Sequence, residues 1–428
     1  MAHHTHHPKS ADDPSFKLPE SLAALGVPLV GIGGVLLAIG LIMGLLFGPT
    51  SEVHGQTRGP WSFTLSAYLV AFTFCFSISL GCLFFVLIQH LCRAGWSVVI
   101  RRVAELFMIA IPALSILFIP ILLSVWSDSG VLFRWSDASF GDHHGIPQLV
   151  WAEKLRYLNS GWFTLRSVIY LVLLSGLAIY YFKLSRLQDE TGALSLTERM
   201  QARSGPAVMV FSLVTTFAAF DWLMSLAPMW FSTMFGVYFF AGSILAAHCA
   251  IAATTYLLQS RGAIRDEVTV EHYHDLGKFL FGFVTFWTYI AFSQFMLIWY
   301  ANIPEETEWF YTRLQGNWQT LSYALIFFHW MFPFLGLLSR HVRRRPNLVF
   351  AWSIYLLVVH FVELYWIVMP EFGKTLGGFG GLLAAALLTL GMLGLYTGGL
   401  LWFIRCKQIK VLAVRDPRLP ESLAFENL

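Results

Sequence analysis

The sequence predicts an all-α integral membrane protein with ten transmembrane helices, and three observations carry this prediction. Of the 428 residues, 57% are hydrophobic, 16% are aromatic and only 12% are charged, whereas soluble domains carry about 25% charged residues. Long apolar runs recur along the whole chain. Backbone groups inside a bilayer must be hydrogen-bonded within the protein, so apolar runs of this length are expected to be helices rather than open strands.

Ten apolar runs reach the length of roughly 20 residues that a bilayer core requires. They divide the chain into a polar cytoplasmic tail over 1–24, a membrane domain over 25–404 and a second cytoplasmic tail over 405–428. Several runs are longer than a straight span needs, which indicates tilted or protruding helices. The expected spans are 25–48, 64–92, 98–125, 161–184, 205–227, 230–259, 275–302, 318–340, 347–369 and 377–404.

Cysteine usage and net charge argue against several function classes. The five cysteines form no CxxC pair and no CxxCH haem-attachment site, so we expect no zinc, iron–sulfur or covalent haem site on this chain. A dispersed net charge of +3 does not indicate a nucleic-acid partner. The start MAHHTHHPKSADDPSF has no apolar core and is not a signal peptide. Its four histidines fit a disordered native tail, a tag remnant or a weak metal site, and we expect a disordered tail.

The distribution of basic residues predicts the orientation, because Lys and Arg concentrate on cytoplasmic loops. With a cytoplasmic N-terminus, 18 of the 28 Lys and Arg residues fall on cytoplasmic segments, and the loop RHVRRR (340–345) is the strongest anchor. Both termini are therefore expected in the cytoplasm. The opposite side carries two aromatic loops, 126–160 and 301–317, which are either ordinary solvated loops or docking surfaces; His143 and His144 are expected to be solvated. Only six basic residues lie on that side: Arg58, Arg134, Lys154, Arg156, Arg313 and Lys374.

Ionisable residues inside the apolar runs are candidates for function, because a charge at membrane depth is costly unless it is paired or hydrated. In VVIRRVAELF, at the cytoplasmic start of the third span, Glu105 follows Arg101 by four residues and Arg102 by three. These spacings allow Glu105 to pair with both arginines. The group is either an anchoring ion pair or the cytoplasmic entry of a proton path. Lys278, near the start of the seventh span, is expected at a similar depth.

Three histidines and one acid are expected near the middle of the membrane. They are His248 on the sixth span, His329 on the eighth, and His360 with Glu363 on the ninth. His360 and Glu363 are three residues apart, so they share a helix face. A single such histidine is usually a hydrogen-bonded core residue. Together, the four groups favour a polar track through the membrane about as much as they favour ordinary core positions.

Asp221 is the one carboxylate in the aromatic stretch FAAFDWLMSLAPMWFS (217–232). It lies about six residues, or roughly 9 Å, below the outer end of the fifth span. Arg166 on the fourth span is expected at a matching depth, so we expect the two residues to pair or to share water. The pair is either a static link between two helices or the outer end of a proton path. The full predicted path comprises Arg102, Glu105, Arg166, Asp221, His248, Lys278, His329, His360 and Glu363.

Four stretches resemble the NrfD/PsrC-like family of membrane proteins, and they occur in the family's order. The chain is most similar to the second such subunit of bacterial alternative complex III, a quinol:cytochrome c oxidoreductase, and the resemblance covers the second to ninth spans. It implies two four-helix bundles, spans 2–5 and spans 6–9, flanked by spans 1 and 10. The four stretches are AGWSVVIRRVAELF (94–107), YLNSGWFTLRSVIY (157–170), FDWLMSLAPMWFSTMFGVYFFAGS (220–243) and WYANIPEETEWF (299–310).

The resemblance also implies a location and partners. The chain would lie in the bacterial inner membrane with a multihaem cytochrome c subunit, an iron–sulfur subunit, a sister NrfD-like subunit, a monohaem cytochrome and small membrane subunits. Haem c and iron–sulfur clusters would belong to those partners, and this chain would bind no cofactor and hold no catalytic residue. Its expected role is assembly and a proton path through Arg102, Glu105, Arg166 and Asp221, with the polar residues of spans 6–9; the histidines match no short motif of the family.

Three other interpretations stay open from the sequence. The first is a quinone-binding anchor that itself binds quinol. The second is a haem b protein, which needs two histidines on facing helices, for instance His248 and His329. The third is a secondary transporter. Transporters often have spans interrupted near the midplane, and here the prolines that could interrupt a span are few: Pro112, Pro120 and Pro333.

Overall fold

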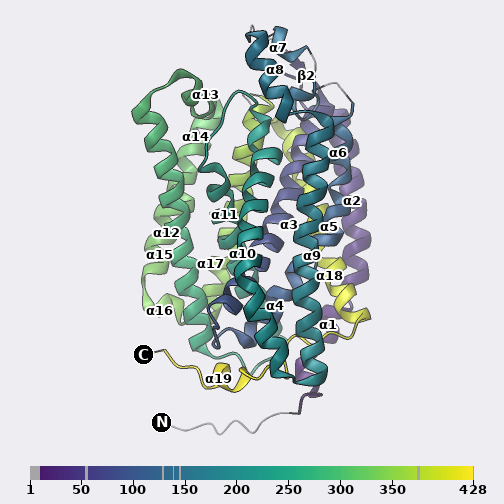
Figure 1. Cartoon of the computed structure of the whole chain (residues 1–428), viewed down its shortest axis with the longest axis vertical. Coiled ribbons are helices and arrows are strands. Elements are labelled where there is room, and N and C mark those ends of the chain that lie inside the picture. Colours follow the sequence, from purple (N-terminus) through teal and green to yellow (C-terminus); the bar gives the residue numbers. More distant parts are fainter. Residues whose placement is uncertain are drawn as a thin grey trace.

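The structure is a computed structural model that describes residues 10–53, 56–127, 130–137, 139–143, 146–373 and 376–427. Within these residues, ten segments are helical, long and apolar enough to cross a membrane. This confirms the predicted all-α, multi-pass architecture. The helices run side by side along the long axis of the molecule (Figure 1). The N-terminal histidines, His144 and Lys374 lie outside the described residues.

Every predicted span corresponds to one of these segments. In chain order they are α2 (Gly26–Phe47), α3 (Pro60–Leu91), α4 (Val98–Met108) with α5 (Ile111–Leu117) and α6 (Ile119–Val125), α9 (Ser160–Thr191), α10 (Leu194–Trp222), α11 (Phe235–Ser260), α12 (Val270–Ala301), α14 (Gly316–Leu325) with a π-helical turn (Ile326–Met331) and α15 (Phe332–Leu338), α17 (Pro346–Val368) and α18 (Gly378–Cys406).

Two predicted boundaries differ clearly from the structure. The fourth span was expected to end at 184 and the fifth to begin at 205, but α9 continues to Thr191 and α10 starts at Leu194. Hydropathy marks where a helix is apolar, whereas polar residues on both sides of a short turn continue these two helices. The turn is made by Gly192, whose φ of +67° lies in the left-handed region that favours glycine.

Short elements cap the two ends of the helical body. One end carries α1 (Glu20–Ala23), α16 (Arg340–Arg343), α19 (Leu419–Leu423) and both terminal segments, and we call it the terminal end (Figure 1). The opposite end, called the loop end, carries α7 (Phe140–His143), α8 (Gln148–Tyr157) and α13 (Pro304–Arg313). A two-stranded antiparallel hairpin of β1 (Ser51–Val53) and β2 (Gln56–Arg58) lies there too, with Ser51 opposite Arg58.

The helices α3 and α11 form the centre of the body. Both are buried along most of their length. The first packs against α4, α10, α11, α17 and α18, and the second against α12 and α17. On one side of α3, the first and last spans, α2 and α18, pack tightly on each other. A Cβ added at Gly33 would lie 2.6 Å from the backbone nitrogen of Leu395, so glycine is required for this close helix contact.

The first long loop is partly an extension of the core. Phe133 and Trp135 are 1% and 2% exposed, and their rings pack on Phe163 of α9 at centroid distances of 5.0 and 5.2 Å. The interpretation of 126–160 as an ordinary solvated loop is therefore wrong for this part of it. Packing these aromatic rings on the helix is favourable because it removes their apolar surface from water.

Candidate functional site

Buried ionisable side chains gather at three depths of the helical body. The terminal-end network comprises Arg101, Arg102, Glu105, Asp189 and Asp416. The central cluster lies deeper and comprises His329, His360, Glu363, Ser77 and Trp287. The loop-end pair lies at the other end and consists of Arg166 and Asp221.

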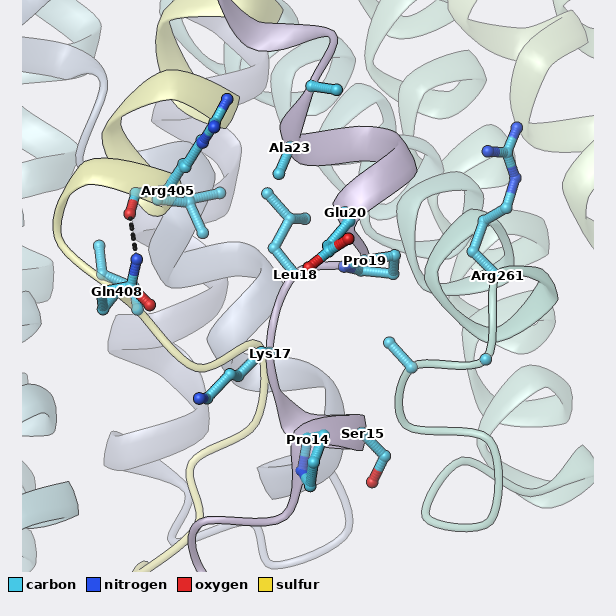
Figure 2. A pocket seen from close by; sticks show the side chains of 15 residues that line it. Pro14, Ser15, Lys17, Leu18, Pro19, Glu20, Ala23, Arg261, Arg405 and Gln408 are labelled. Atoms are coloured by element: carbon cyan, nitrogen blue, oxygen red, sulfur yellow. Dashed lines mark hydrogen bonds between the residues drawn. The ribbon is translucent and has the colours of Figure 1, made fainter.

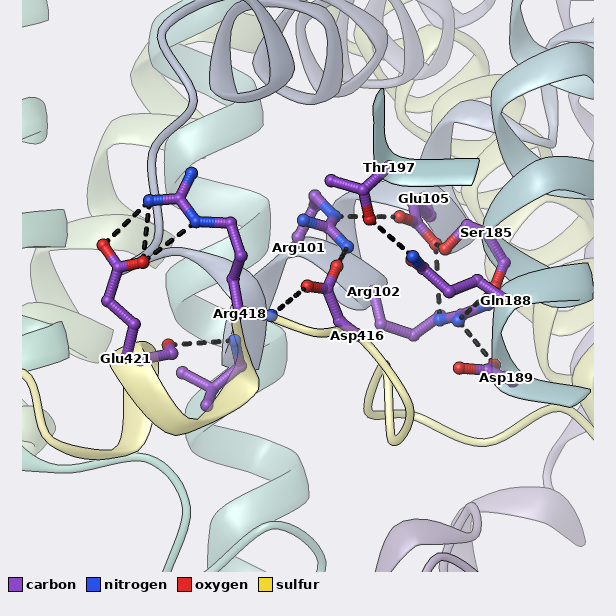
Figure 3. A network of polar contacts seen from close by, with 12 residues as sticks. Arg101, Arg102, Glu105, Ser185, Gln188, Asp189, Thr197, Asp416, Arg418 and Glu421 are labelled. Atoms are coloured by element: carbon purple, nitrogen blue, oxygen red, sulfur yellow. Dashed lines mark hydrogen bonds and ion pairs between the residues drawn. The ribbon is translucent and has the colours of Figure 1, made fainter. Parts of the chain in front are cut away.

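Glu105 is the centre of the terminal-end network (Figure 3). Its carboxylate lies 3.2 Å from Nε of Arg101 and 3.3 Å from Nε of Arg102, and it accepts a hydrogen bond of 2.7 Å from the Ser185 hydroxyl. Both Arg102 and Glu105 are fully buried. The predicted pairing of Glu105 with the two arginines is confirmed. These contacts fix the position of the carboxylate between the two guanidinium groups.

Two further carboxylates complete the network, and the sequence analysis assigned a role to neither. Asp189, near the end of α9, lies 2.6 Å from Nη2 of Arg102, and Asp416 in the C-terminal tail pairs with Nη2 of Arg101. Burial acts to raise the pKa of Asp416, but the adjacent Arg101 outweighs it and holds that pKa below its ordinary value. Three carboxylates therefore face two guanidinium groups in this network.

The C-terminal tail is fixed over this network by its own contacts. The Ser422 hydroxyl donates to the Trp96 carbonyl at 2.6 Å and accepts from the Val99 amide at 3.3 Å. The Ser422 carbonyl lies 3.1 Å from Nε2 of His272. Because the tail is bonded to α12 and to the segment that leads into α4, Asp416 is positioned by tertiary contacts, and no local pattern in the sequence could have identified it.

The central cluster is built around Glu363 of α17. Its Oε2 lies 2.9 Å from Nδ1 of His360 and 3.7 Å from Nδ1 of His329, while Nε1 of Trp287 donates to its Oε1. On the far side of the His360 ring, Nε2 lies 3.0 Å from the Ser77 hydroxyl. All of these side chains are buried. The prediction that His360 and Glu363 share a face is confirmed, and the structure adds His329 as a third titratable neighbour.

His329 has an unusual backbone and an unusual environment. It lies in the π-helical turn Ile326–Met331, and such turns often mark functional sites because the extra residue re-aims a side chain. Its ring stacks on Trp287 at a centroid distance of 3.8 Å. Among the described residues, neither ring nitrogen has a hydrogen-bond partner. Buried polar atoms are nearly always hydrogen-bonded, so this imidazole differs from the usual core histidine in keeping both ring nitrogens available for a hydrogen bond.

Gly242 of α11 allows the central cluster to assemble. A Cβ added there would lie 2.9 Å from Cε1 and 3.2 Å from Nδ1 of His360, and 3.3 Å from Oε2 of Glu363. Any larger residue would therefore push the imidazole and the carboxylate apart. The sequence analysis did not identify this position, because a glycine in an apolar helix has many other uses.

The loop-end pair is a two-pronged ion pair. Nε and Nη2 of Arg166 donate to the two carboxylate oxygens of Asp221 at 2.8 and 2.9 Å, and the Tyr170 hydroxyl donates to Oδ2 at 2.8 Å. The guanidinium also stacks over the ring of Tyr157 at 3.8 Å. Asp221 is fully buried, whereas the Arg166 side chain is 16% exposed. The predicted pairing is confirmed, and Arg166 connects the buried acid to the surface.

Two predicted path residues lie apart from these groups. His248 bonds through Nδ1 to the Ile244 carbonyl of its own helix at 2.8 Å, and its ring packs between Phe279 and Phe283. It is a hydrogen-bonded core residue. Lys278 is 43% exposed and pairs with Asp275 on its own helix, α12, which begins at Val270.

A further buried charge cluster at the loop end escaped the sequence analysis. Nη1 of Arg313 lies 3.1 Å from Oε1 of Glu371, and Arg134 lies 3.5 Å from Oε2. Burial lowers the pKa of Arg313 to about 10, and burial together with nearby Arg134 lowers the pKa of Arg58 to about 9. These arginines were counted only as loop charges, and Glu371 follows the apolar run, so no spacing linked them. The cluster joins the two long loops to the end of α17.

The chemistry available to the three groups is the binding and release of protons. The described residues hold no group of three or more His, Cys, Asp or Glu side chains arranged to bind a metal ion. His248 is enclosed by phenylalanines and His329 lies against Trp287, so these two histidines do not fit a haem held between facing helices. No protein-family model and no curated protein matches the chain.

Proposed function

We propose that this chain is a membrane subunit of a quinol:electron-acceptor (cytochrome c) oxidoreductase of the alternative complex III type, where it supports assembly and carries protons across the membrane. In this proposal it has the NrfD/PsrC-like arrangement of two four-helix bundles and resembles ActF, the second such subunit of that complex. The observation that carries the proton-path part is the presence of buried titratable groups at three depths, with an incompletely bonded histidine in the middle one.

The proposed path begins at the terminal end. Glu105 takes up a proton from the cytoplasm through the network that Asp189 and Asp416 complete. The proton is next held in the central cluster, where Glu363 is hydrogen-bonded to His360 at 2.9 Å, so a proton can move directly between these two groups. His329 lies 3.7 Å from Glu363 and would receive the proton through water. It leaves near Asp221. Water molecules carry the proton between the three groups, as in other intramembrane chains of Asp, Glu and His.

The proposed orientation places the terminal end in the cytoplasm of the bacterial inner membrane. The support is the basic loop at 340–345, which lies at the same end as both terminal segments (Figure 1), and the preference of basic loops for the cytoplasmic side. The loop end, with its aromatic and charged surface, then faces the partners. These are the multihaem cytochrome c, iron–sulfur and monohaem subunits, which would hold the haem c groups and iron–sulfur clusters.

A quinol-binding role for this chain is a second candidate, because one groove at the loop end favours it. The groove has a volume of about 290 Å³ and is lined by Lys154, Tyr157, Phe217 and Phe231, among others. Tyr157 also stacks against the guanidinium of Arg166. A flat aromatic headgroup held there would lie next to the loop-end pair. Crosslinking of a photoreactive quinone to this groove would establish this second role.

Two measurements test the proposed function. Affinity purification of the native chain should recover haem- and iron–sulfur-containing subunits; a stable, active, isolated chain would contradict the assignment to such a complex. In the purified complex in vesicles, Glu363→Gln should abolish proton uptake coupled to quinol oxidation while the subunits stay assembled. The control is Glu305→Gln, the same chemical change at an exposed position of α13. Normal proton uptake by Glu363→Gln would exclude the central cluster from the path.

A further inference from the structure

A large cavity lies at the terminal end, and none of the residues that line it belongs to the three buried charge groups. Its volume is about 760 Å³, and three separate segments line it. The N-terminal segment contributes 14–24, the turn after α11 contributes 261–263, and the end of α18 with the start of the C-terminal tail contributes 404–409. Figure 2 shows these segments surrounding Glu20.

The walls of this cavity are fixed by backbone hydrogen bonds between the segments. The Ile264 amide donates to the Ser15 carbonyl at 3.1 Å, and the Val411 amide donates to the Phe16 carbonyl at 2.8 Å. Phe16 is 5% exposed and packs into the hydrophobic core. The N-terminal segment is thus held between the α11–α12 connection and the C-terminal tail. The cavity is therefore part of the fold and not a gap between loose ends.

The charges around the cavity are mainly positive. Lys17, Arg261 and Arg405 come from the three different segments, and Glu20 is the one acid in the lining. Arg261 donates to the Ser21 hydroxyl at 3.1 Å. All three cations are exposed. Because cations outnumber acids in this lining, the cavity attracts an anion, and several N–H donors are available to bind that anion.

The cavity also lies beside the ends of two apolar spans. It adjoins the start of α2 and the end of α18, which are the outermost turns of two apolar spans. On these turns, Val27 is 60% and Trp402 is 52% exposed. Exposed tryptophan at the end of a span is typical of the membrane–water interface. Acyl chains can lie along this apolar surface while a headgroup enters the cavity.

We propose that this cavity binds the headgroup of an anionic phospholipid. The phosphate would be held among Lys17, Arg261 and Arg405, and the acyl chains would lie along α2 and α18. Basic pockets between spans on the cytoplasmic side are suited to such headgroups. The site would tie the lipid to both terminal segments at once. It does not depend on the proton path, because none of its residues belongs to the three buried groups.

Lipid titration of the full-length purified protein in detergent, followed by native mass spectrometry, tests this site. The wild-type protein should bind phosphatidylglycerol more tightly than phosphatidylcholine. The double variant Lys17→Gln/Arg405→Gln should lose about 30-fold in affinity for phosphatidylglycerol, since each cation near an anionic headgroup contributes about fivefold. Its affinity for phosphatidylcholine should stay unchanged. Neither replaced side chain is buried, so the variant is expected to fold.

A matched control separates this site from general surface charge. Arg199→Gln/Arg340→Gln removes two exposed cations at the same end but outside the cavity lining, and it should keep wild-type affinity. An equal loss in the control, or no loss in the Lys17/Arg405 variant, would overturn the site. An excess of inorganic phosphate should not displace phosphatidylglycerol; displacement would mean that the cavity binds free phosphate and not a lipid.

Discussion

Replacing Asp221 by Asn is the most informative change at the loop-end pair. Asparagine keeps the volume of the side chain, but it removes the charge and turns one of the two acceptors facing Arg166 at 2.8 and 2.9 Å into a donor. Removing one member of a fully buried pair costs about 3–5 kcal/mol. The Arg166 side chain is 16% exposed and can be rehydrated in the variant. We therefore expect a smaller loss of unfolding free energy, about 2–3 kcal/mol, which is close to the value of one charge-assisted hydrogen bond.

Thermal unfolding and proton release should be measured on the same Asp221→Asn preparation. If Asp221 is the outer proton-release group, the variant assembles, is less stable and releases no protons at the loop end. If the pair is only a structural link, stability falls by the same amount and proton release continues. Tyr170→Phe is the control, because it removes one hydrogen bond to Asp221 and leaves the charge pair intact. Unchanged stability and unchanged proton release would refute the buried ion pair itself.

Three further predictions follow from the other groups. Glu105→Gln should abolish proton uptake from the terminal end in vesicles with assembly intact, and normal uptake would reduce the residue to an anchor. Gly242→Ala should destabilise the protein by about 1–3 kcal/mol in thermal unfolding through overpacking, whereas Gly282→Ala, where an added Cβ meets nothing within 4 Å, should not; equal effects would argue against the tight contact. The pKa of Asp416 is held low by Arg101 against the opposing effect of burial, so its stabilising contribution is complete above about pH 4, its ordinary pKa, and is lost as pH falls below it. The protection factors of the C-terminal tail amides, which compare each exchange rate with that of an unfolded peptide at the same pH, should therefore be high at neutral pH and fall below about pH 4. Asp416→Asn should give low protection factors at every pH; high protection factors in both cases would show that this ion pair does not hold the tail.

The sequence was a good guide wherever the evidence was local. Arg101 and Glu105 are four residues apart and His360 and Glu363 three, and helical geometry alone brings each pair together. Depth matching along two adjacent antiparallel spans was sufficient to pair Arg166 with Asp221. These inferences succeed because the rise and the turn of a helix are nearly constant.

The same reasoning gave no answer where the position of a side chain depends on the rotation of its helix. His248 and His329 were expected at comparable depth, yet one is enclosed by phenylalanines and the other faces Glu363. A span that is apolar on most faces gives no periodic signal of which face turns inward. The π-helical turn at Ile326–Met331 adds a further shift that no spacing rule anticipates.

The sequence by itself therefore determined that this is a membrane protein, the number and order of its spans, and the ion pairs within or between consecutive helices. Only the tertiary structure decided which distant residues meet: the C-terminal Asp416 with Arg101, and α17 with the π-helical turn at His329. The physical reason is that composition and length set which segments enter a bilayer, whereas close packing at residues such as Gly33 and Gly242 sets how each helix is rotated against its neighbours.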